Sequence, residues 1–214
     1  MAFTKEEICS NALILLGHTS ISSFTDGTPA ADTCAVRYPM TRDVAMVGYP
    51  WNFTFEKVQL SQDLTAPVST YDHRYLLPSN GLADGVIALY SSADTNQLPT
   101  NRYVVQGGYV LTNEDNLWAD YQKDVLEAYW PGYFANFVSH ALAADIAFAI
   151  TKKLNTANYW HGVTYGNSNQ GGVGGVYGKA RNLDSYHSPP NNRMTDFPLV
   201  SARIGGVGSW PSSS

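Results

Sequence analysis

The chain has 214 residues, which is enough for one domain with a sizeable core, with or without an inserted second part. Only 14 % of the residues are charged, the formal net charge is −5, and Lys and Arg do not cluster anywhere in the sequence. Contacts to nucleic-acid phosphates need clustered cations, so these values argue against a general nucleic-acid-binding protein. A composition rich in Gly, Tyr, Ser, Asn and Thr is typical of an ordered protein with a weakly charged surface.

Nothing in the sequence predicts secretion or a membrane span. The first residues, MAFTKEE, lack the basic segment and the long apolar core of a signal peptide. The most apolar stretch, residues 129–150, contains polar side chains that would be costly in lipid. They are Asn136, His140 and Asp145. Cys9 and Cys34 lie in helix-like segments, which favours buried free thiols over a disulfide and a reducing setting during synthesis.

Two helices are predicted within the first 50 residues. The segment TKEE at residues 4–7 has the capping-box pattern that begins a helix, and Gly17 is placed to end it. A second helix is predicted to begin at Thr28-Pro29, with proline at its first position and a kink at Pro39. We expect the inward-facing residues of this second helix to include Cys34, Val36, Tyr38 and Val44.

The pattern changes from helical to strand-like at residues 48–56. The segment Gly48-Tyr49-Pro50 is predicted to end the second helix, and the apolar residues that follow alternate with polar ones as in a half-buried strand. These apolar residues are Trp51, Phe53 and Phe55. We expect Pro50, Trp51 and Phe53 to fill the junction between the helices and a sheet. The alternative is an exposed aromatic patch for a partner.

A small antiparallel sheet is predicted between residue 51 and about residue 125. Residues 86–90 read as one strand, and RYVVQGGYVLTN reads as a hairpin that turns at Gln106-Gly107-Gly108. Helix is predicted again after Trp130-Pro131, through GYFANFVSHALAADIAFAITKKL. Its apolar residues cover more than one face, so either this helix is central in the monomer or a neighbouring subunit covers part of it. They include Phe134, Phe137, Val138, Ala141, Leu142, Ile146, Phe148 and Ile150.

The segment 157–185 is rich in glycine and allows two interpretations. Each glycine costs about 1 kcal/mol relative to alanine within a helix, which favours a flexible loop. Several of the glycines are four residues apart, a spacing that lets helix backbones approach closely. They are Gly162/Gly166, Gly171/Gly175 and Gly174/Gly178. After Asp184, the motifs SPPNN and FPL predict an extended arm that docks on another surface or stays disordered.

The predicted fold is therefore mainly α with inserted β, in the α+β class. Residues 1–50 and 126–185 are expected to form an antiparallel helix bundle, and residues 51–125 an inserted β domain. Residues 186–214 are expected to form an extended C-terminal arm.

The motifs of common enzyme sites are absent from the sequence, so we expect no catalytic, cofactor-binding or metal-binding residues. The segment GGVGGVYGK has Val173 and Ala180 where a phosphate-binding loop needs glycine and Ser or Thr. The five histidines have no partner at metal-ligand spacing. Two alternatives remain. One is a peptidoglycan hydrolase that uses a pair of carboxylates from Glu56, Asp63, Asp72, Glu114, Asp115 and Asp120. The other is a carbohydrate-binding module built on Tyr90, Tyr103, Tyr109 and Trp118.

Several stretches, taken in order, resemble the tail tubular protein A or head-to-tail adaptor family of short-tailed bacteriophages. They are ALILLGHTSISSFTDGTPAADTC, YPMTRDVAMVGYPWNF, YDHRYLLPSNG, VVQGGYVL, ARNLDSYHSPPNN and PLVSARIGG. The Gly-rich stretch 162–178 departs from the family, whose members tend to have better helix formers there. No single motif is diagnostic, and the resemblance rests on their order and spacing.

The resemblance implies a non-enzymatic virion protein without cofactors. Family members form a ring of twelve copies between the portal protein and the tail nozzle protein, and genomic DNA passes through the ring without sequence-specific binding. The implied location is the tail or neck of the virion, and the host cytoplasm during assembly. We expect the arm to dock on a neighbouring subunit or on the portal. Its candidate interface residues are Pro189, Pro190, Phe197, Leu199 and Arg203.

Overall fold

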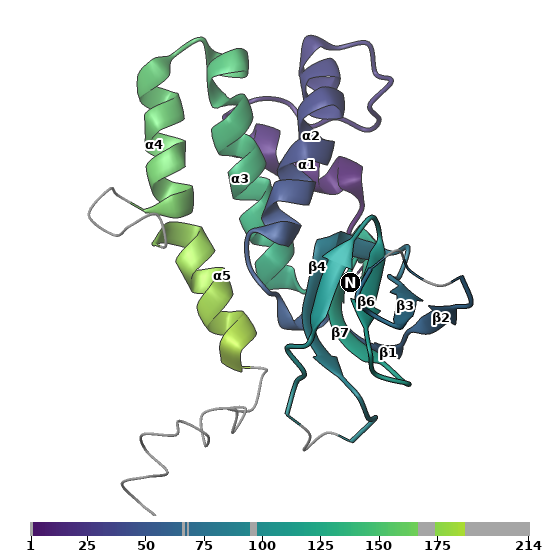
Figure 1. The fold of residues 1–214 in the computed structure, drawn as a ribbon. Helices are drawn as coiled ribbons and strands as arrows, with labels where there is room; N and C mark the ends of the chain where they lie inside the picture. Colours follow the sequence, from purple (N-terminus) through teal and green to yellow (C-terminus); the bar gives the residue numbers. More distant parts are fainter. Residues whose placement is uncertain (1, 66, 68, 95–97, 167–173, 187–214) are drawn as a thin grey trace, which may run out of the picture.

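Helices and strands occupy separate stretches of the chain and separate parts of the molecule (Figure 1). The computed structural model describes residues 2–65, 67, 69–94, 98–166 and 174–186. The helices in these residues are α1 (Lys5–Leu15), α2 (Pro29–Val47), α3 (Gly132–Thr151), α4 (Leu154–Tyr165) and α5 (Gly175–Tyr186). The strands are β1 (Phe55–Gln59), β2 (Ser61–Asp63), β3 (His73–Leu76), β4 (Gly81–Tyr90), β5 (Tyr103–Gln106), β6 (Tyr109–Thr112) and β7 (Trp118–Lys123). This is a mixed α+β fold.

The predicted ends of α1 are confirmed. The Thr4 hydroxyl accepts the Glu7 N–H at 3.2 Å, and the Thr4 N–H donates to the Glu7 carboxylate at 2.9 Å. At the other end, Gly17 takes a positive φ of 75°, and the N–H of His18 donates to the carbonyl of Leu13 at 2.9 Å. Glycine adopts this left-handed conformation without the strain that a side chain would cause, so the helix stops here.

Helix α3 lies at the centre of the helical part. It packs against α1, α2, α4 and α5, which together cover most of its circumference. Its buried residues are Phe134, Ala135, Phe137, Val138, Ser139, Ala141, Leu142, Ala143, Ile146 and Ala147. Of the two arrangements considered for this helix, the structure therefore has the one in which it is central in the monomer. Phe148, expected to be packed, is instead 55 % exposed. Among the described helices, only α3 is long and apolar enough to cross a membrane, and 56 % of its most apolar window is buried inside the protein.

The inward face of α2 differs from the one expected. Cys34 and Tyr38 are buried as expected, but Val36 and Val44 point to the outside, where they are 75 % and 64 % exposed. Successive residues of a helix are about 100° apart. Positions 34 and 38 therefore share the core face, whereas position 36 lies opposite to it and position 44 about 100° away from it. Both cysteines are buried free thiols, as predicted.

The strands form two sheets rather than the single sheet expected. One has the order β1-β7-β4 and the other β2-β3-β6-β5, with antiparallel pairing throughout. Leu60, which alone separates β1 from β2, donates its N–H to Leu117, and the chain changes sheets at this point. The predicted hairpin is confirmed, with positive φ at Gly107 and Gly108 between β5 and β6. A second core between the sheets contains Leu60, Tyr75, Leu89, Val110, Leu117 and Ala119.

The expected strand beginning at Trp51 is wrong. Residues Asn52–Thr54 form a short 3-10 turn, and β1 begins only at Phe55. The Thr54 N–H and the Thr54 hydroxyl both donate to the carbonyl of Trp51, which closes the turn. The alternation of apolar residues therefore reflects a turn whose aromatic side chains pack on the helices.

The Gly-rich segment contains parts of two helices. Helix α4 ends at Tyr165, and α5 begins at Gly175, which has a φ of +61°. A Cβ at Gly175 would lie 2.3 Å from the carbonyl oxygen of Val163, so glycine allows the start of α5 to pack directly on the end of α4. Residues 167–173, and the arm residues 187–214 with Pro189, Pro190, Phe197, Leu199 and Arg203, lie outside the described residues.

Candidate interaction surface

Trp51 occupies the corner where α2 gives way to the strands. Its side chain is fully buried, and its indole N–H donates to the carbonyl of Ala45 at 2.9 Å. Its ring lies 4.9 Å from that of Phe134 on α3. Phe53 is half-buried, 5.0 Å from the same phenylalanine, whereas Pro50 is exposed. Trp51 is thus a core residue of the helical part and contributes nothing to an exposed patch.

Gln122 of β7 ties this corner to the sheet. Its side-chain amide donates to the carbonyl of Tyr49 at 3.1 Å and to the hydroxyl of the buried Thr54 at 3.0 Å. The same residue pairs with Phe55 in the β1–β7 register. One side chain therefore links the end of α2, the 3-10 turn and the middle strand of the three-stranded sheet.

Arg42 of α2 forms a second link between the helices and the strands. Its guanidinium, 13 % exposed, donates to Asp124 just after β7 and to Glu127 at 3.2 Å, and Tyr38 also donates to Glu127 at 2.9 Å. Burial lowers the pKa of Arg42. The hydrogen bond to Asp124 and the charge of Asp124 act in the opposite direction, and together with Asp43 and Glu127 they raise the pKa above its usual value. We call Tyr38, Arg42, Asp124 and Glu127 the Arg42 clamp.

Asp184 of α5 forms a third link. Its carboxylate has no exposed surface and accepts the Asn52 N–H at 3.0 Å and the Tyr133 hydroxyl at 2.6 Å. The Asn52 side chain donates back to the Asp184 carbonyl at 2.8 Å. Burial, and then the bond to Asp184, raise the pKa of Tyr133. These bonds hold the C-terminal end of α5 against the turn after Trp51.

The sequence patterns predicted none of the three links, although the residues Arg42, Asn52 and Asp184 lie in stretches that carry the family resemblance. Arg42 and Asn52 belong to YPMTRDVAMVGYPWNF, and Asp184 belongs to ARNLDSYHSPPNN. The 132-residue separation between Asn52 and Asp184 left no local pattern that could reveal the contact. Asp184 is a charged residue on the buried face of the amphipathic helix α5, and buried carboxylates are normally paired.

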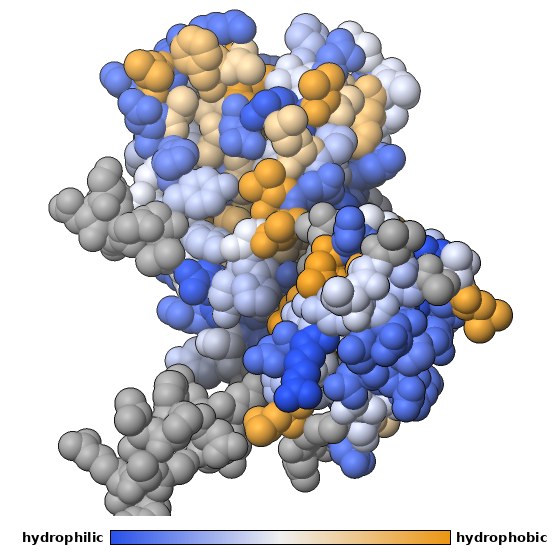
Figure 2. Space-filling view, in the orientation of Figure 1, coloured by the Kyte–Doolittle hydropathy of each residue, from blue (hydrophilic) through white to orange (hydrophobic). Residues whose placement is uncertain are grey.

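The clearest candidate interaction surface is the outer face of α2. Four aliphatic residues follow one another there at helical spacing, and we call them the outer stripe. They are Val36 (75 % exposed), Met40 (61 %), Val44 (64 %) and Val47 (49 %). Figure 2 shows apolar side chains along the course of α2 on the face in view. Because the opposite face of α2 is buried in the core, the helix is apolar on two sides, and only one is covered.

Two carboxylates of the hydrolase alternative have cationic partners. Asp63 pairs with Arg74 and Glu56 with Lys123, whereas the Asp115 carboxylate lies 3.4 Å from the imidazole ring of His73. Backbone hydrogen bonding from Thr65, followed by the bond to Arg74, lowers the pKa of Asp63, which opposes the role of a general acid. In the described residues, no group of three or more His, Cys, Asp or Glu is placed to hold a metal ion.

Two of the four aromatic residues of the carbohydrate-binding alternative have a cation over one ring face. Tyr90 is buried, and the ammonium of Lys57 lies 4.1 Å from its ring centre. The guanidinium of Arg74 lies 4.7 Å from the ring centre of Tyr109. Stacking of a sugar needs a free ring face, and on each of these two tyrosines a cation already occupies one.

A scan against protein-family models finds no match, and no curated protein matches the sequence.

Proposed function

We propose that this protein is a structural adaptor of a bacteriophage virion, which assembles with copies of itself into a ring between the portal and the tail nozzle. The subunit would be an antiparallel helix bundle that carries a small β domain and an extended C-terminal arm. Genomic DNA would pass through the ring without sequence-specific binding. The observation that carries the proposal is the outer stripe of α2, together with the order of the motifs that resemble the adaptor family.

The outer stripe has the character of a protein interface. Single exposed aliphatic residues are common on soluble proteins, whereas a contiguous apolar strip marks a contact site. A closed ring needs a heterologous contact, in which one surface of each subunit meets a different surface of the next. A helix with one face in its own core and the other face uncovered can supply one half of such a contact.

The remaining features suit a rigid ring component. The Arg42 clamp and the Asp184 bonds join α2, the strands, α3 and α5 by polar contacts, most of them partly buried. Subunits that keep a constant shape favour closure of a ring with a defined number of copies. The net charge of −5 reduces binding to the DNA that would pass through the channel.

The proposal is tested by the mass of the assembly. We expect light scattering of the purified protein, alone or mixed with its portal, to give the mass of a ring with about twelve copies. We expect the substitutions M40K and V44K each to prevent formation of this ring. Both substitutions place a charge in the outer stripe, which would be costly to bury at an interface. Leu64→Lys is the matched control, since Leu64 is 98 % exposed and lies just after β2.

Thermal melts followed by circular dichroism would show that each variant remains folded. A wild-type protein that stays monomeric both alone and with the portal would contradict the proposal. Assembly that tolerates both α2 substitutions would show that the outer stripe is not the contact.

A further inference from the structure

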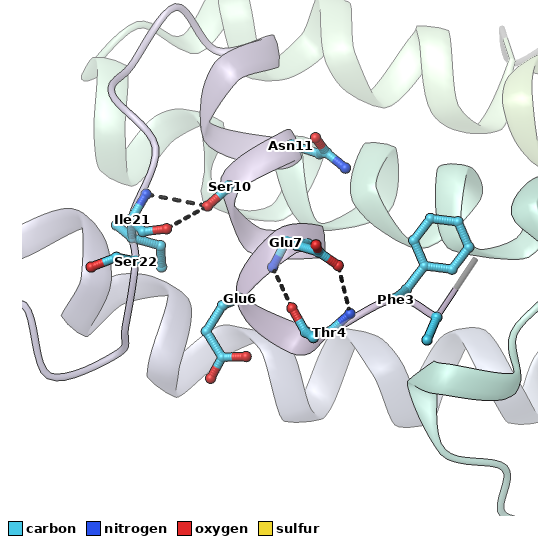
Figure 3. A pocket seen from close by; sticks show the side chains of 9 residues that line it. Phe3, Thr4, Glu6, Glu7, Ser10, Asn11, Ile21 and Ser22 are labelled. Carbon is cyan, nitrogen blue, oxygen red and sulfur yellow. Dashed lines mark hydrogen bonds between the residues drawn. The ribbon is translucent and has the colours of Figure 1, made fainter.

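A groove runs along α1 on a side of the molecule that contains no residue of the outer stripe. One hollow of about 620 Å³ lies beside the first turns of α1 and residues 21–22 (Figure 3). A second hollow, of about 370 Å³, lies between α1 and α3. Phe3 and Asn11 line both hollows, so the two lie next to each other along α1. Figure 3 shows Ser10 turned toward the backbone of Ile21 on one side of α1, with Phe3 and Asn11 on the other.

The chemistry of the second hollow suits an extended peptide. Its apolar walls include Phe3, Ile14 and Ala135, and Ile14 is 57 % exposed. The side-chain amides of Asn11 and Asn136 also line it, and neither makes a hydrogen bond within the described residues. An asparagine amide offers two donors and an acceptor, which match the carbonyl and N–H groups of a peptide backbone. Among the described residues, no Asp, Glu, Lys or Arg lines this hollow, and His140 is its one titratable side chain.

The described chain ends close to this groove. Asp184 accepts the hydroxyl of Tyr133 at 2.6 Å, so the last turn of α5 lies beside the first turn of α3. The neighbouring residue Gly132 lines the groove. Phe197 comes eleven residues after Tyr186. An extended chain spans about 3.3–3.6 Å per residue, so this segment is long enough to pass around the end of α3 and enter the groove.

The composition of the following residues matches the groove. Residues 187–204 contain the apolar motif FPLV and three prolines, whose rings favour an extended conformation. In that conformation the backbone carbonyls are unpaired, so they can accept hydrogen bonds from the two asparagine amides. Arg193 and Arg203 outnumber Asp196, which gives this segment a positive charge. The first hollow has Glu6 and Glu7 at its edge.

We propose that residues 187–204 fold back around the first turn of α3 and bind in the α1–α3 groove of the same chain. The tether makes this contact intramolecular, with an effective concentration in the millimolar range, so a modest interface is sufficient. Phe197 and Leu199 would pack between Ile14 and Ala135. The inference does not depend on the adaptor function, because the groove and the outer stripe share no residue.

Photo-crosslinking of the full-length chain tests the proposal directly. A benzoyl-phenylalanine incorporated in place of Phe197 should crosslink, on irradiation, to residues within 3–15 or 132–140, as identified by mass spectrometry. The experiment uses a mixture of unlabelled and ¹⁵N-labelled protein without portal. If both peptides of every crosslinked pair carry the same isotope, the segment docks in its own chain. Mixed pairs would assign the segment to a neighbouring copy, and crosslinks only outside the groove would exclude the site; either result overturns the proposal.

Trypsin cleavage of the same full-length protein gives a second measurement. Docking should slow cleavage after Arg193 and Arg203, and Asn136→Trp, which fills the groove, should speed it by about tenfold if the docked form is about 90 % populated. Asn158→Trp on the exposed side of α4 is the matched control and should leave the rate unchanged. Equal cleavage rates in the wild type and in Asn136→Trp would overturn the proposal.

Discussion

Trp51 holds the corner between α2 and the strands through its ring and its N–H. The ring packs against Tyr49, Phe134 and Phe137, and the indole N–H satisfies the carbonyl of Ala45. At the same corner, the buried carboxylate of Asp184 is satisfied by a backbone N–H and a hydroxyl. Trp51 and Asp184, which meet at this corner, are therefore both buried and hydrogen-bonded.

Trp51→Ala should lower the free energy of unfolding by about 3–5 kcal/mol, because it removes a buried ring and leaves a cavity among aromatic neighbours. Urea denaturation would measure the change. Tyr129→Ala is the matched control: Tyr129 is 76 % exposed, so its loss should change the free energy of unfolding by about 0.5 kcal/mol or less. A loss below about 1 kcal/mol for Trp51→Ala would mean that the ring does not anchor this corner.

At the scale of the element, the spacing of apolar residues in α2 does not decide which face of the helix is buried. The helix carries apolar residues on two opposite faces, so sequence spacing identified a helix but gave Val36 and Val44 the wrong face. The contacts of Tyr38 and Arg42 with Glu127 orient the helix, and Glu127 lies 85 residues beyond Arg42. The choice between the two apolar faces thus depends on long-range polar contacts.

Pro39 lies inside α2 and is exposed, which makes it a direct test of element stability. Pro39→Ala should raise the free energy of unfolding by about 1–3 kcal/mol, because alanine restores the N–H that proline cannot donate to the carbonyl of Ala35. Thermal melts would show the effect as a higher Tm. Pro29→Ala should change stability little, because proline suits the first position of a helix. A Tm that falls in Pro39→Ala would mean that the packing of α2 depends on the proline.

Across the described parts of the molecule, several buried tyrosine hydroxyls and the Cys9 thiol favour their neutral forms. Burial raises the pKa of Tyr165 to about 12, and burial is also the leading cause of the raised pKa values of Tyr38 and Tyr133. Hydrogen bonding of the Cys9 thiol to Cys34, followed by burial, raises the pKa of Cys9, whereas the same hydrogen bond lowers the pKa of Cys34. At Cys9 and at the three tyrosines, the folded protein keeps a proton that the unfolded chain would release in alkaline solution.

Stability should therefore fall in alkaline solution. For Tyr165 the folded pKa lies above the usual value of 10.0, so its contribution is complete below about pH 10 and is lost as the pH rises toward about 12. Urea midpoints measured between pH 8 and pH 12 would show the decline. Tyr165→Phe should make the decline shallower, whereas Tyr159→Phe, at a residue 63 % exposed, should not. A midpoint that stays constant up to pH 12 would contradict the prediction.

Local patterns predicted the elements whose causes are local. The capping box at Thr4, the proline at position 29 and the glycine pair of the β5–β6 hairpin all formed as expected, because each depends on backbone groups only a few residues away. The strand expected at Trp51 did not form, since the alternation of apolar residues there serves packing on α3. A period of two is compatible with both arrangements when the neighbouring helix is unknown.

The sequence by itself determined the α+β class, the helix ends, the hairpin and the burial of the cysteines, because short-range hydrogen bonds and composition decide these features. Only the tertiary structure decided that the strands form two sheets, that α3 is covered within the monomer, and that α2 leaves an apolar face uncovered. It also brought Arg42 to Asp124, and Asn52 to Asp184. These features depend on groups far apart in the chain, whose approach is a property of packing rather than of any local pattern.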